Sequence, residues 1–117
     1  MYLYGGLAPM DDAANWVRVA TVKQVGRGEM FAAKAGDRLI AVFHLDDDSW
    51  HAIENVCTHA YALLTEGWLD GDSIECPLHA GRFDVRTGKG LCAPIDEDVA
   101  SYKVRIEGAD VLVAVPV

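Results

Sequence analysis

Two short pairs of metal-binding side chains lie in the middle of the chain. Cys57 and His59 are separated by one residue, and Cys76 and His79 follow after sixteen intervening residues. Each pair offers one thiolate and one imidazole, which are ligands for zinc and for iron. Both pairs lie in segments without a strand pattern, so two turns could approach each other and direct four ligands at one centre. The spacing therefore predicts a metal site with two cysteine and two histidine ligands.

The choice of metal depends on how the ligands are grouped. Zinc sites usually place at least two residues between paired ligands, and they group cysteines with cysteines and histidines with histidines. A two-iron cluster with mixed ligands needs two cysteines on one iron and two histidines on the other. Two loops that each deliver one cysteine and one histidine meet that requirement. Zinc remains an alternative, as do two buried thiols or a disulfide beside histidines that are merely polar.

The segments around these loops predict β-structure. Apolar and β-branched stretches bounded by turn residues predict strands at 16–19, 29–33, 38–44, 50–54, 73–75, 82–85, 101–107 and 111–115. We expect the first four to form an antiparallel meander and the last two to form a hairpin. No segment has a long helical period. The region 55–94 has only short β-like pieces, so its irregular backbone needs something to organise it.

Composition and charge limit the class of protein. A chain of 117 residues with 51% apolar and 24% charged residues predicts one globular domain. The longest apolar run, 111–117, is much shorter than the roughly 20 residues of a membrane helix. Residues 1–15 contain no Lys or Arg, which a secretory leader requires, so we expect a cytoplasmic protein. The net charge of -8 argues against nucleic-acid binding and favours basic protein surfaces as partners.

The two pairs resemble a known family. Cys57-x-His59 followed by Cys76-Pro77-x-His79 is similar to the Rieske motif. The resemblance covers about 16–115. The chain is especially similar to the ferredoxin components of bacterial aromatic-ring-hydroxylating dioxygenases of the naphthalene type. It is carried beyond the ligands by the run 75–85, by Thr87-Gly88-Lys89 and by Cys92-Ala93-Pro94.

The resemblance implies a fold and a cofactor. The fold is the mainly-β Rieske fold, an antiparallel β-sandwich basal domain with an inserted two-loop cluster-binding subdomain. Residues 1–15 would be an N-terminal arm, 16–117 a single Rieske domain and about 55–94 the subdomain. One 2Fe-2S cluster would be bound by Cys57 and Cys76 on the inner iron and by His59 and His79 on the outer iron. The family's proline-containing covering loop would be Cys92-Ala93-Pro94.

The resemblance also implies a function. The chain would be a one-electron carrier without catalytic residues, and not an enzyme. It would take electrons from an NAD(P)H-dependent flavin reductase and deliver them to a terminal Rieske oxygenase; we expect a monomer that binds neither nucleic acid nor membrane. Two other hypotheses are a non-catalytic Rieske subunit of a larger reductase, similar to the nitrite reductase small subunit, and a zinc-stabilised interaction module.

Four positions bear on the reduction potential. High-potential Rieske proteins of respiratory complexes add a disulfide between the loops and hydroxyl donors to the cluster. This chain has Ala62 and Leu78 in place of the extra cysteines, and Gly81 and Phe83 in place of the serine and tyrosine. The resemblance therefore implies a potential at the low end of the Rieske range, around -150 mV.

The remaining candidate side chains have plainer interpretations. Cys92 is expected to be a packed thiol, because the ligand set is complete without it and cysteine is commonly buried. His44 and His51 lie on predicted strands, outside both loops, and are expected to be surface or core residues. Tyr61 and Trp68 are more often core or loop packing than docking aromatics.

Overall fold

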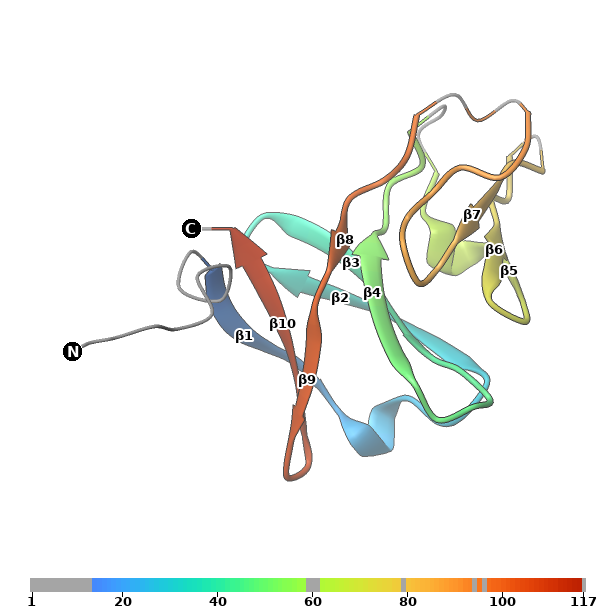
Figure 1. The fold of residues 1–117 in the computed structure, drawn as a ribbon. Coiled ribbons are helices and arrows are strands. Elements are labelled where there is room, and N and C mark those ends of the chain that lie inside the picture. Colours follow the sequence, from blue (N-terminus) through green and yellow to red (C-terminus); the bar gives the residue numbers. More distant parts are fainter. Residues whose placement is uncertain (1–13, 59–61, 79, 94, 96, 117) are drawn as a thin grey trace.

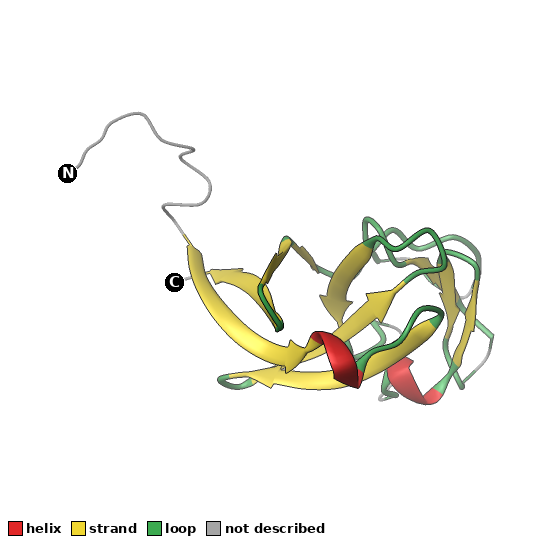
Figure 2. Ribbon diagram, turned by 90° about the horizontal axis from the view of Figure 1, so that it is seen from below, coloured by secondary structure: helices red, strands yellow, loops and turns green. Residues whose placement is uncertain are grey.

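The computed structural model describes residues 14–58, 62–78, 80–93, 95 and 97–116, and these are almost entirely strands and loops (Figure 1, Figure 2). Only two short 3₁₀ turns interrupt them in the described part of the chain. The elements in chain order are β1 (Ala14–Thr21), η1 (Val22–Gln24), β2 (Glu29–Ala35), β3 (Arg38–His44), β4 (Trp50–Glu54), η2 (Leu64–Glu66), β5 (Trp68–Asp70), β6 (Ser73–Glu75), β7 (Arg82–Asp84), β8 (Ser101–Tyr102), β9 (Val104–Glu107) and β10 (Asp110–Pro116).

One basal sheet joins the two ends of the described chain. Its strand order is β1-β10-β9. β1 pairs antiparallel with β10 from Ala14 opposite Pro116 to Thr21 opposite Asp110, with a register shift between Arg18 and Ala20. β9 pairs with the other side of β10 through a tight hairpin in which Gly108 has a φ of 60°. Glycine adopts this left-handed conformation without the steric cost of a Cβ.

The second basal sheet separates two hydrophobic cores. Its order is β2-β3-β4-β8, and all of its pairs are antiparallel. Successive side chains of a strand point to opposite faces. On β3, Ile40 and Val42 face a core shared with β1 and β10, whereas Ala41 and Phe43 face a second core formed with the loop region. Burial on both faces explains why 39–43 is an uninterrupted apolar run.

The chain passes from one basal sheet to the other at Lys103, as it also does between β1 and β2. β8 pairs with β4, and after Lys103 the chain continues as β9, which pairs with β10 in the other sheet. Figure 1 shows β8 and β9 following one another along the same side of the base. The two sheets therefore form the sandwich around the first core.

A small three-stranded sheet forms a lobe beside the base (Figure 1). Its order is β5-β6-β7, and its inner face consists of Leu69, Ile74 and Phe83. Ile74 and Phe83 are fully buried. These three side chains pack on the second core, so the lobe is attached to the basal sheet by apolar contacts rather than by strand pairing.

The structure confirms the mainly-β class and the bounds of β3, β4 and β6, and it corrects three other expectations. The first four strands do not form one meander, because β1 pairs with β10 and not with β2. The segment 101–107 is two strands that belong to different sheets, and the predicted strand 82–85 ends at Asp84. β5 was not predicted at all. Within the described residues, no helix has the length and apolar character to span a membrane.

Candidate metal centre

The structure brings both predicted cysteine ligands into the second core. Cys57 follows the end of β4 and Cys76 follows the end of β6. Their exposed fractions are 3% and 0%, and they share one apolar cluster with Leu64, Ile74 and Phe83. No disulfide joins them. Two segments far apart in the sequence thus place two thiols in one dry environment.

The two cysteines occupy equivalent positions in two similar loops. The Cys57 N–H donates to the Ala62 carbonyl at 2.9 Å, and the Cys76 N–H donates to the Gly81 carbonyl at 2.7 Å. Each loop is therefore closed by a hydrogen bond from its cysteine to the residue five positions later. In the second loop, Ala80 has a φ of 59°, an uncommon conformation for a residue with a Cβ. This backbone strain lies within the predicted ligand loop.

The electrostatics of the pair suit a cation. Burial raises the pKa of the Cys76 thiol, and the neighbouring Cys57 thiol raises it further. The Leu78 N–H opposes these effects by donating to the Cys76 Sγ at 3.4 Å. Two adjacent buried thiols cannot both ionise at low cost unless a positive charge lies between them. Bound metal ions deprotonate such thiols, so this donor pair fits an iron atom of the predicted cluster.

A third loop closes over the two ligand loops. The Thr58 hydroxyl of the first loop donates to the Glu97 carbonyl at 2.8 Å, and the Cys92 Sγ lies 4.0 Å from the Ala80 carbonyl of the second loop. The Ile95 N–H donates to the Cys92 carbonyl at 3.0 Å, which tightens this third loop. The arrangement agrees with the expected covering loop, although Pro94 lies outside the described residues.

Cys92 is exposed, so its interpretation as a packed thiol was wrong. The reason is its position: it lies on the outer loop, whereas Cys57 and Cys76 follow strands that point into the core.

Four of the residues singled out in the sequence lie outside the described part of the chain, as do residues 1–13 of the expected N-terminal arm. They are Tyr61, Pro94 and the expected ligands of the outer iron, His59 and His79. The assignment of the two histidines as ligands therefore stays a prediction.

The first loop depends on a residue that the sequence analysis missed. Asn55, two positions before Cys57, has an exposed fraction of 2%. Its Nδ2 donates to the Thr65 hydroxyl at 2.9 Å, and its Oδ1 accepts from the Thr65 N–H at 2.9 Å. Its backbone carbonyl accepts from the Leu64 N–H at 2.7 Å. Asn55 thus fastens the far side of the loop, η2, to the end of β4. A polar residue after a strand gave no sequence signal of this role.

The end of the first loop also packs tightly against the second. A Cβ added at Gly67 would lie 1.8 Å from the Glu75 carbonyl oxygen and 3.2 Å from the Pro77 Cδ. Only glycine permits this approach of two backbones. Gly67 and Asn55 together hold the two ligand loops in contact.

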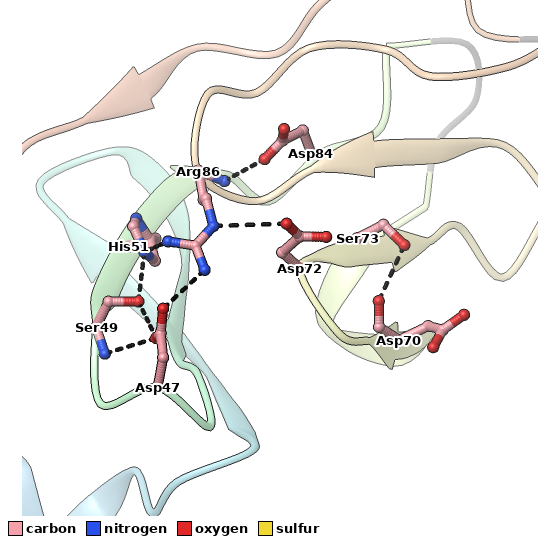
Figure 3. Close-up of polar contacts among 8 residues, drawn as sticks. All are labelled: Asp47, Ser49, His51, Asp70, Asp72, Ser73, Asp84 and Arg86. Atoms are coloured by element: carbon pink, nitrogen blue, oxygen red, sulfur yellow. Dashed lines mark hydrogen bonds and ion pairs between the residues drawn. The ribbon is translucent and has the colours of Figure 1, made fainter.

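Polar contacts join the lobe to the base on the side shown in Figure 3. Arg86, which follows β7, pairs with Asp47 of the β3–β4 turn at 2.9 Å and with Asp72 of the β5–β6 turn at 3.5 Å. Hydrogen bonds from Ser49 and from Arg86 hold the pKa of Asp47 well below its usual range. Burial and the nearby Arg86 lower the pKa of His51, whose Nε2 lies 2.8 Å from the Ser49 hydroxyl.

The contacts of His44, the other histidine on a strand, also involve no metal. His44 lies on β3 and stacks on Trp50 with ring centroids 4.0 Å apart. Its Nδ1 is 2.9 Å from the Val25 carbonyl and its Nε2 is 2.6 Å from the Asp48 carboxylate. His44 and His51 thus lie on strands away from both loops, as expected.

The exposure of Trp68 contradicts its interpretation as a packing residue. This residue is on β5, an edge strand of the lobe, and 60% of its surface is exposed. β5 was not predicted, and the alternation of this strand places Leu69 inward and Trp68 outward.

Comparisons with known proteins agree with this site. A family model described as "Rieske [2Fe-2S] domain" matches residues 15–103. The ferredoxin component of the naphthalene 1,2-dioxygenase/salicylate 5-hydroxylase systems of Ralstonia sp is 40% identical over 98 residues, which are 84% of this chain and 93% of that protein.

Two solved structures extend the comparison to the fold. The ferredoxin of Sphingomonas yanoikuyae B1 superposes with a TM-score of 0.81 at 36% identity, covering 87% of this chain and 100% of that one. A chain in the complex of reduced oxygenase and oxidized ferredoxin in carbazole 1,9a-dioxygenase superposes with a TM-score of 0.77 at 35% identity, covering 85% and 92%. The similarity therefore spans both the base and the lobe.

Proposed function

The chain belongs to the Rieske [2Fe-2S] family, and from this membership we propose that it carries single electrons within an aromatic-ring dioxygenase system. It accepts an electron from an NAD(P)H-dependent flavin reductase and delivers it to a terminal oxygenase. The proposal draws on relatives that are ferredoxin components of such systems. In this role the protein acts as a cytoplasmic monomer that transfers one electron at a time.

The cofactor is one Rieske-type 2Fe-2S cluster, and this chain's ligands to it are Cys57 and Cys76 on one iron and His59 and His79 on the other. When bound, the cluster supplies a centre that gains and loses one electron. Cys57 and Cys76 supply the negative charge, and the apolar side chains around them exclude water from that side. The Leu78 N–H donates toward the Cys76 sulfur, a contact that favours added negative charge there.

One observation carries the proposal. Two buried cysteines from distant parts of the sequence meet in one core, each at the start of a loop closed by the same type of backbone hydrogen bond. A packed core gains nothing from placing two ionisable thiols together and leaving them unlinked. A metal centre that needs one thiolate from each loop explains the pairing.

The cofactor assignment is tested on the purified protein. Handled without oxygen, it should be red-brown, contain iron and sulfide in equal amounts, and after reduction give the paramagnetic signal of a mixed-ligand cluster. Cys57→Ser and His79→Ala should lose that signal, whereas Cys92→Ser should retain it. An intact signal in His79→Ala would contradict the ligand set, and absence of iron and sulfide from the parent protein would contradict the cofactor.

The carrier role is tested by reconstitution. NADH-dependent product formation by a reductase and a terminal oxygenase should require this protein, and the protein should be reduced and reoxidised by separate partners. Size-exclusion chromatography should give a monomer. Purification in fixed stoichiometry with a larger reductase would contradict a free carrier and favour a bound subunit.

A further inference from the structure

We propose that the outer face of the small sheet, with Trp68 at its edge, is a docking surface for the terminal oxygenase. This outer face consists of Trp68, Asp70, Ser73, Glu75, Arg82 and Asp84. The inference rests on the proposed function, because it assigns a surface to one of the two partners of the carrier.

Strand register places these residues on one side of the lobe. Trp68 is opposite Glu75 and Glu75 is opposite Arg82, whereas Leu69, Ile74 and Phe83 form the row that faces the core. Residues directly opposite on paired strands share a face. The outer face is therefore the side of the small sheet opposite the row that packs on the second core, and β5 is one of its two edge strands.

Trp68 differs from the other two tryptophans of the chain. Trp16 lies under the Arg105 guanidinium at 4.3 Å, and Trp50 stacks on His44. Trp68 has an exposed fraction of 60%, the highest of the exposed large apolar side chains among the described residues. Exposing this much aromatic surface to water is unfavourable. Tryptophan is also one of the residue types enriched among the side chains that dominate binding at protein interfaces.

Beside Trp68 the polar side chains are already ordered. Arg82 donates to the Glu75 carboxylate at 2.9 Å, to the Ser73 hydroxyl at 3.1 Å and to the Asp70 carboxylate at 3.4 Å. Side chains that are held before binding lose less conformational entropy when a partner covers them. The outer face carries the three carboxylates of Asp70, Glu75 and Asp84, of which Arg82 pairs with the first two, so it keeps a negative charge. It fits a partner with an apolar hollow and a basic rim.

The outer face adjoins the proposed cluster site. Glu75, opposite Trp68, is followed directly by Cys76, and Leu78 of the same loop is 43% exposed. A partner seated on Trp68 and Glu75 therefore also covers the second ligand loop, where electron exchange would take place. We assign this surface to the oxygenase, because a chain similar to this one is known from a complex of reduced oxygenase and oxidized ferredoxin.

The test uses the cluster-containing protein and three matched variants. Trp68→Ala removes the aromatic ring, Trp68→Phe retains an aromatic ring, and Ile106→Ala removes an exposed apolar side chain from β9 of the base. Product formation by the oxygenase is measured against carrier concentration with the reductase in excess. Trp68→Ala should raise the KM for the carrier about ten- to thirtyfold, equivalent to about 1.4 to 2 kcal/mol. Its kcat should be unchanged. The KM of Trp68→Phe should stay within about threefold of the parent's, and the KM of Ile106→Ala should equal the parent's.

The controls separate docking from damage to the protein. Each variant should keep the parent's visible spectrum, paramagnetic signal and rate of reduction by dithionite. If Trp68→Ala loses its cluster, Trp68→Thr, which retains a strand-forming residue, replaces it and should show the same rise in KM. An unchanged KM for the carrier in the oxygenase assay, or a change confined to the reductase step, overturns the docking surface while leaving the carrier role intact. A parent protein that supports no turnover contradicts the carrier role itself.

Discussion

The substitution Asn55→Ala tests whether the first ligand loop is held by one buried side chain. Two hydrogen bonds join the Asn55 amide to Thr65, and both are 2.9 Å long. The variant keeps the backbone hydrogen bonds of residue 55 but leaves the Thr65 N–H and hydroxyl without these partners. Water cannot readily reach them from the Asn55 side, because Asn55 is only 2% exposed.

The expected loss of stability follows from these contacts. A buried donor left unsatisfied costs about 1 to 3 kcal/mol, and the second, neutral hydrogen bond contributes about 0.5 to 1.5 kcal/mol. Together they predict a loss of about 1.5 to 4.5 kcal/mol. A domain of about 100 residues loses about 4 to 8 °C in Tm for each kcal/mol. We therefore expect Asn55→Ala to lower the Tm by at least about 6 °C.

The assay compares holoproteins at one concentration and one scan rate, with unfolding followed by circular dichroism and cluster loss by visible absorbance. Thr65→Val removes only the hydroxyl contact, so its Tm should fall between those of the parent and Asn55→Ala. Asn15→Ala, an exposed asparagine on β1, should change stability by less than about 0.5 kcal/mol. If Asn55→Ala unfolds within about 2 °C of the parent, the Asn55–Thr65 contact does not hold the loop and the reasoning is refuted.

Three further predictions concern charge and potential. The lowered pKa of His51 means that the folded protein favours the neutral imidazole, so its contribution to stability is complete above the unfolded pKa of about 6.5 and declines as the pH falls below it; His51→Gln should remove that part of the decline in chemical unfolding at pH 7 and pH 5.5. Ser49→Ala and Arg86→Gln should each raise the pKa of Asp47, because each removes a hydrogen bond that holds it low; nuclear magnetic resonance titration of Asp47 measures both, and a pKa left unchanged by either variant would contradict the role of that contact. Phe83→Tyr should raise the reduction potential by some tens of millivolts, since about 1.4 kcal/mol of added stabilisation of the reduced state corresponds to about 59 mV for one electron; an unchanged potential with an intact cluster, measured by protein-film voltammetry, would show that the new hydroxyl does not reach it.

The sequence alone predicted the kind of site and much of the local structure. The spacing of Cys57, His59, Cys76 and His79 predicted a mixed-ligand centre, because the residue types and the gaps between them suit few metal groups. The bounds of β3, β4 and β6 were predicted correctly, since apolar runs ended by turn residues depend on nearby sequence.

Only the tertiary structure decided which strands pair and which side chains remain exposed. β1 pairs with β10 across almost the whole chain, and the segment 101–107 divides between two sheets at Lys103. Neither feature has a local signal, because pairing is selected by the total apolar surface that distant strands can bury together. The same limit applies to single residues. Trp68 and Cys92 look like core residues by type, yet one lies on an outer sheet face and the other on an outer loop. Asn55 looks like a surface residue, yet the approach of η2 to β4 buries it and makes it part of the site.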